Sequence, residues 1–221
     1  MNQQYVATTR PSTFVVNKLI RNTYMLLSMT LLFSACTASV SLFLQMPPMT
    51  YLICIGAAFL MMWFVLPRTA QSSAGLGVVF AITGLMGFAL GPILAMYLSL
   101  ANGPTIIATA LAGTGVIFFA LSGYALVSRK DFSFMAGFLL VGLLVVLVAA
   151  LANIFLSIPA LSLALSAAII MIMAGFILYD TSRMIHNADS TNYILMTVSL
   201  YVSIFNIFVN LLHLLGIASD E

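Results

Sequence analysis

Five polar side chains near the carboxyl end of the chain recur at helical spacing. They are Ser199, Ser203, Asn206, Asn210 and His213, which follow one another at intervals of four, three, four and three residues. Residues at this spacing share one face of a helix, and lipid cannot satisfy their hydrogen bonds. We therefore expect this polar stripe to face other helices or a water-filled cavity. Polar packing between helices and one wall of a polar pathway or sensor site are both open interpretations.

Asp180 is the only acidic residue within an apolar stretch of membrane-spanning length. Burying a carboxylate in a membrane is expensive, which makes this residue a candidate functional group. Two kinds of partner are open to it. Arg183 lies three residues further on, a neighbouring position on a helix, and could form an ion pair at the membrane surface. Alternatively, a polar group of the stripe could approach Asp180 inside the bundle.

Small residues and a proline mark another stretch. Gly87 and Gly91 form a GxxxG pattern that is followed directly by Pro92. This spacing allows two helices to approach closely, and an internal proline leaves one backbone carbonyl without its usual partner. We interpret the three residues as a helix-packing site. The chain contains no metalloprotease, serine-hydrolase or phosphate-binding motif, so neither enzyme activity nor a cofactor or metal site is expected.

The composition predicts that lipid surrounds the elements holding these residues. The chain has 221 residues, of which 63% are hydrophobic and only 5% are charged, whereas soluble domains contain about 25% charged residues. A membrane span needs about 20 apolar residues, so the length allows seven spans joined by short loops. We expect an all-α membrane protein in the lipid bilayer, without a nucleic-acid partner.

Proline, glycine and charged residues divide the chain into one domain of seven spans. The predicted domain covers residues 22–217, between a polar tail at 1–21 and a short tail at 218–221. The predicted spans are 22–45, 50–67, 75–98, 104–127, 134–157, 160–182 and 193–217. All seven Lys and Arg residues then fall on one side of the membrane. Since basic residues favour the cytoplasmic side, we expect the amino terminus in the cytoplasm and the carboxyl terminus outside.

The chain also resembles the Bax inhibitor-1 (TMBIM) family of seven-helix membrane proteins. The matching segments are RNTY at 21–24, GPIL at 91–94, SRKDFS at 128–133, ANIFL at 152–156, YDTS at 179–182, TNY at 191–193, VSLYVS at 198–203 and NIF at 206–208. They extend over nearly the whole chain. The resemblance is strongest to bacterial members of the family, which implies a bacterial inner-membrane location.

For this branch the resemblance implies a regulator that binds the membrane-anchored protease FtsH and restrains its action on membrane substrates. Residues 1–21 would then hang into the cytoplasm, either as a segment that such a protease can grasp or as an inert tail. Other family members carry two acids that are linked to a pH-sensitive cation leak, especially of calcium. Asp180 matches the first acid, whereas the second falls on Ser203. A cation leak is therefore the alternative function, and a small-molecule transporter is a weaker one.

Overall fold

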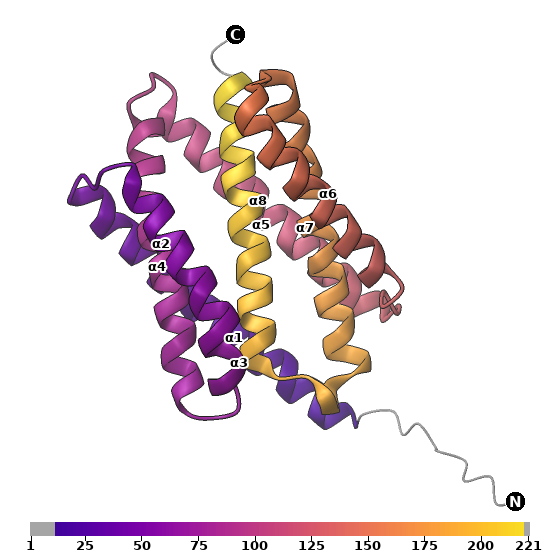
Figure 1. The fold of residues 1–221 in the computed structure, drawn as a ribbon. Coiled ribbons are helices and arrows are strands. Elements are labelled where there is room, and N and C mark those ends of the chain that lie inside the picture. Colours follow the sequence, from indigo (N-terminus) through magenta and orange to yellow (C-terminus); the bar gives the residue numbers. More distant parts are fainter. Residues whose placement is uncertain (1–11, 219–221) are drawn as a thin grey trace, which may run out of the picture.

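The computed structural model describes residues 12–218, which fold into a bundle of long helices (Figure 1). Within this part of the chain, seven helical spans are long and apolar enough to cross a membrane, as the sequence predicts. The spans are α1 (Thr13–Phe43), α2 (Met49–Leu60) with its continuation, α4 (Ala74–Leu98), α5 (Gly103–Ser128), α6 (Met135–Leu156), α7 (Pro159–His186) and α8 (Tyr193–Ala218). The π-helical segment η1 (Met61–Val65) and α3 (Leu66–Thr69) continue α2, and the 3-10 turn η2 (Ala188–Ser190) precedes α8.

Two helices extend beyond their predicted spans. Helix α1 begins at Thr13 instead of residue 22, where the Ser12 hydroxyl accepts a hydrogen bond from the Val15 backbone N–H at 3.4 Å. Helix α7 continues to His186 instead of residue 182. Hydropathy marks where the apolar stretch ends, but a helix with polar side chains can continue past that point. Residues 1–11 of the predicted amino-terminal tail and 219–221 of the carboxyl-terminal tail lie outside the described residues.

The basic residues gather at one end of the bundle. Helix α1 begins at this end and carries Lys18 and Arg21 there, while α3, α5 and α7 end near it. The loop after α5 contributes Arg129 and Lys130. We call this end of the bundle the basic end. Helix α8 ends at the opposite end (Figure 1).

Helix α8 passes through the middle of the bundle and packs against α1, α4, α5 and α7 (Figure 1). In its most apolar stretch 56% of the residues are buried, compared with 11% in α6. Burial on α8 therefore does not follow the polar stripe. Ile204 and Ile207, which lie off the stripe, are buried. Within the stripe only Ser203 is buried, and the other four residues are half-buried.

The most extensive helix packing among the described residues joins α1 to α4. Gly87 and Gly91 lie at this contact, and a Cβ atom on either residue would collide with α1. At Gly87 the collision is with Ser34, and at Gly91 it is with Ser41. Helix α4 continues as a single helix through Pro92.

Candidate functional site

Three consecutive residues near the end of α7 form the most connected polar site of the bundle. Asp180, Thr181 and Ser182 are all buried, with 3%, 0% and 1% of their surfaces exposed. Successive residues of a helix point in directions about 100° apart. Each of the three side chains therefore reaches a different neighbouring element. We call them the α7 triplet.

The Asp180 carboxylate bonds to the polar stripe of α8. The Ser199 hydroxyl donates a hydrogen bond to Asp180 Oδ2 at 2.6 Å. Within residues 12–218 no salt bridge or hydrogen bond joins Asp180 to Arg183. Of the two partners that the sequence leaves open, the structure therefore places a stripe hydroxyl on the carboxylate and leaves the arginine outside hydrogen-bonding distance.

Thr181 joins α7 to two further helices. Its hydroxyl lies 3.4 Å from the Tyr24 hydroxyl of α1 and 3.5 Å from the Ser122 hydroxyl of α5. Tyr24 and Ser122 are also hydrogen-bonded to each other. Three hydroxyl groups thus hold three helices together at the basic end. This cluster was not predicted from the sequence, although RNTY and YDTS are among the segments that carry the family resemblance.

Ser182 fixes the loop between α5 and α6. Its hydroxyl accepts a hydrogen bond from the Phe132 backbone N–H at 3.0 Å and donates one to the Lys130 carbonyl oxygen at 3.2 Å. Further along the loop, the Ser133 backbone N–H donates to Asp131 at 2.9 Å and holds the pKa of that exposed carboxyl below its usual value. The loop therefore has a defined shape against the end of α7.

The remaining stripe residues mainly bond to their own helix. Ser203 donates to the Ser199 carbonyl oxygen at 3.1 Å, Asn206 to that of Val202 at 2.8 Å, and Asn210 to that of Asn206 at 2.8 Å. Such bonds satisfy polar side chains without a partner helix. In this part of the stripe, the side chains therefore bond to the backbone of α8 itself. Among the described residues, these side chains are not hydrogen-bonded to one another in a continuous chain along the helix.

At the far end of the stripe, His213 reaches α7 again. One ring nitrogen lies 2.8 Å from the Ser166 hydroxyl, and the other lies 3.5 Å from that of Ser162. The two serines are four residues apart, a spacing that could have marked them from the sequence. A cavity of about 440 Å³ adjoins this contact and is also lined by Asn210 and by Asn153 of α6. Hydrogen bonds from α8 to α7 thus occur near both ends of the stripe.

Comparison with known proteins identifies the family. The family described as "Inhibitor of apoptosis-promoting Bax1" matches residues 16–220. The chain belongs to the Bax inhibitor-1 family. "Modulator of FtsH protease YccA" from Escherichia coli (strain K12) is 51% identical over 96% of this chain and 95% of its own length. A counterpart from Escherichia coli O6:H1 (strain CFT073), called "Inner membrane protein YccA", matches equally well.

Another bacterium contains a similar protein. A membrane protein of Vibrio cholerae is 46% identical over 95% of this chain and 93% of its own length. The chain is thus an inner-membrane protein of the Bax inhibitor-1 family. The segments RNTY, SRKDFS, YDTS and VSLYVS, which carry the resemblance, all contribute contacts to the α7 triplet.

Proposed function

We propose that this Bax inhibitor-1 protein modulates the FtsH protease by binding it in the inner membrane and restraining its action on membrane substrates. The observation that carries the proposal is the 51% identity, over nearly the full length of both chains, to the FtsH modulator YccA. Such coverage leaves little of either protein unmatched. At the basic end of the bundle, the α7 triplet joins α7 to α1, α5, α8 and the loop after α5.

Co-purification tests this function. Membranes holding this protein and a proteolytically inactive FtsH variant are dissolved in mild detergent, and each protein is used in turn to capture the other. We expect reciprocal recovery, and we expect added protein to slow degradation of a membrane substrate by active FtsH. Recovery no greater than that of an unrelated seven-span protein, together with unchanged degradation, would reject the proposal.

The orientation that we propose places the basic end and the amino terminus in the cytoplasm. The positive-inside tendency supports it, because the loops on the other side carry no Lys or Arg. We predict that an alkaline phosphatase fused after Glu221 is active and that a green fluorescent protein at the same position is dark. If the green fluorescent protein fusion is fluorescent and the alkaline phosphatase fusion is inactive, the orientation is the opposite one.

The amino-terminal tail gives a further prediction. If FtsH grips the tail to degrade this protein, deletion of residues 2–11 should lengthen its half-life in cells several-fold. The deletion stops before Ser12, the cap of α1, so the bundle stays intact. A pulse-chase measurement checks the half-life, and replacement of residues 2–11 by a scrambled sequence of the same composition is the control for length. Equal half-lives of the deleted and intact chains would contradict a grip on this tail.

A further inference from the structure

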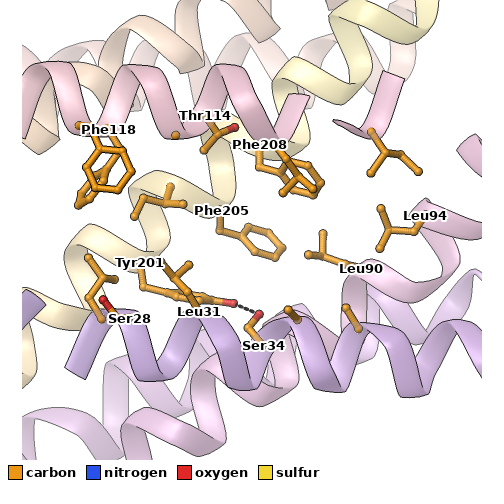
Figure 2. Close-up of a pocket in the computed structure, with 18 of the residues that line it drawn as sticks. Ser28, Leu31, Ser34, Leu90, Leu94, Thr114, Phe118, Tyr201, Phe205 and Phe208 are labelled. Carbon is orange, nitrogen blue, oxygen red and sulfur yellow. Dashed lines mark hydrogen bonds between the residues drawn. The ribbon is translucent and has the colours of Figure 1, made fainter. Parts of the chain in front are cut away.

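A long apolar cavity lies between α1 and α5, with α8 as its floor (Figure 2). Its volume is about 470 Å³, within the range of about 300–1,000 Å³ that is typical of ligand sites. We call this cavity the slot. Leu31 and Ala35 of α1, Leu111 and Gly115 of α5, and Phe205 and Phe208 of α8 are among the residues that line it.

The slot opens sideways, toward the surface that faces lipid. Leu111 and Phe119 on its α5 edge are 57% and 73% exposed, and Ala35 on its α1 edge is exposed as well. Helix α1 packs mainly on α4, whereas α5 packs mainly on α8 and α7. The described contacts between α1 and α5 include those of Tyr24 with Ser122 and Phe118, at the basic end of the slot. Hydrocarbon chains of the bilayer therefore have direct access to the slot.

The polar atoms of the slot already have partners within the protein. At the floor, the Ser34 and Tyr201 hydroxyls bond at 2.5 Å, as Figure 2 shows, and Tyr201 donates to the Thr83 carbonyl oxygen at 3.2 Å. Along the edges, Ser28 and Ser39 donate to backbone carbonyl oxygens of their own helix at 2.9 Å. Water or an ion would find few free groups here, and apolar cavities exclude water. The chemistry of the walls favours a hydrocarbon occupant.

The shape of the slot fits one extended chain. Its α1 wall runs from Tyr24 to Ser39, which is about 22 Å at about 1.5 Å per residue. One leaflet of the bilayer core is about 15 Å thick, half of the whole. A cavity of this length and limited volume is narrow, so it suits an acyl chain better than a bulky ring system or a second helix.

A positive charge lies in line with the mouth of the slot. Arg21 is exposed and precedes the edge residues Ser28 and Ala35 by seven and fourteen residues. Residues seven apart on a helix lie on nearly the same side. Within the described chain, Arg21 forms no salt bridge. Its guanidinium group is therefore available to the negative surface of the leaflet at the basic end.

We propose that the slot binds one acyl chain of an anionic phospholipid from this leaflet, with the phosphate held near Arg21. The site is separate from the proposed contact with FtsH and does not depend on it. Bound lipid fills the gap between α1 and α5 and completes the packing around α8. The bundle is then a lipid-binding protein in addition to its role toward a protease.

Two glycines of α5 allow a matched test. A Cβ atom at Gly115 or at Gly123 meets no atom within 4 Å, but only Gly115 lines the slot. The folded protein is titrated with phosphatidylglycerol and, separately, with phosphatidylcholine of the same chains, and retained lipid is counted by native mass spectrometry. We expect Gly115→Phe to weaken binding by at least about tenfold, since it displaces two or more methylene groups of the chain. Gly123→Phe should bind like the unmodified protein.

The headgroup contact has its own pair of variants. Arg21→Gln should weaken phosphatidylglycerol binding about fivefold, the change expected for one basic residue near an anionic surface. Arg68→Gln, at the same end but away from the slot, should have no effect. Phosphatidylcholine bound as tightly as phosphatidylglycerol would reject the role of Arg21.

A second readout does not depend on lipid surviving purification. The chain has a single tryptophan, Trp63, which lies on η1 away from the slot. In vesicles of chain-brominated phosphatidylglycerol, a Trp63→Phe, Phe205→Trp protein should lose most of its fluorescence, because bromine quenches tryptophan on contact. Adding Gly115→Phe should restore the signal, whereas adding Gly123→Phe should not. Unquenched fluorescence of the Trp63→Phe, Phe205→Trp protein, or equal quenching with both glycine variants, would overturn the proposal.

Discussion

Gly87→Ala and Gly91→Ala are each expected to destabilise the bundle by more than about 1 kcal/mol, although alanine is the better helix former. A methyl group at Gly87 would collide with the carbonyl oxygen of Ser34, a backbone atom that cannot rotate away. At Gly91 it would meet the Ser41 side chain and, at 2.9 Å, the backbone nitrogen of Leu42. Helix α1 would have to move away from α4, and overpacking of this kind costs about 1–3 kcal/mol.

The same displacement should weaken a contact deeper in the bundle. Ser34 also bonds to the Tyr201 hydroxyl of α8, so a shift of α1 at Gly87 loosens both interfaces. We expect a lower midpoint in thermal unfolding of the detergent-solubilised protein, followed by loss of the monodisperse peak in size-exclusion chromatography.

Gly77 supplies the control on the same helix. A methyl group there meets no atom within 4 Å, so Gly77→Ala should be neutral or stabilising by up to about 1 kcal/mol from helix propensity. The predicted signs are therefore opposite for two chemically identical changes. A Gly87→Ala protein as stable as Gly77→Ala would show that α1 and α4 are not packed as described.

The seven spans could be predicted because each is an apolar stretch of the right length between polar or helix-breaking residues. Periodicity also grouped Ser199 with the other stripe residues correctly on one face of α8. It could not show that the opposite face is covered too. Ile207 is fully buried because four helices surround α8. The sequence pattern of a single helix does not show which other helices pack around it.

The partners of the α7 triplet could not be predicted from the sequence for a related reason. The sequence places Arg183 near Asp180 along the same helix, so it offers that pair at once. Ser199 becomes the partner only because α8 returns beside α7 at the matching height. The Tyr24 hydroxyl reaches Thr181 from a residue far away in the chain. Spacing within one helix predicts shared faces, whereas contacts between helices depend on the heights at which the helices meet.

Asp180→Leu is expected to destabilise the protein, whereas Asp180→Asn should be close to neutral. Leucine leaves the Ser199 hydroxyl without its acceptor in a partly buried place, which costs up to about 1–3 kcal/mol. Asparagine keeps an oxygen that can accept the bond, so its cost should be about 1 kcal/mol or less. If Arg183 were instead a buried ionic partner, Asp180→Asn would leave it unpaired and cost about 3–5 kcal/mol. Thermal unfolding of the two variants measures the difference.

Ser199→Ala provides the control, and combining it with Asp180→Leu closes a double-mutant cycle. Since the two side chains share one hydrogen bond, the double variant should lose less stability than the two single changes added together. Ser203→Ala, one turn further along α8, removes a hydroxyl that bonds only to its own helix in the described structure and should not interact energetically with Asp180→Leu. Additive effects of Asp180→Leu and Ser199→Ala would contradict the bond between them.

The same variants distinguish a protease modulator from a cation leak. A pair of close carboxylates can share a proton and titrate together, but Asp180 is the only acid among the buried residues that the structure describes. The family resemblance predicts that the second acid of such a pair falls on Ser203, which carries no charge. We therefore expect proteoliposomes of the unmodified protein to show no calcium flux that switches near neutral pH and disappears in Asp180→Asn. Ser203→Asp adds a second carboxylate, so this variant is the one that could gain such a flux. A robust flux in the unmodified protein that Asp180→Asn abolishes would contradict this expectation. It would mean that one carboxylate bonded to Ser199 suffices for gating. A cation leak would then be a better-supported function than protease modulation.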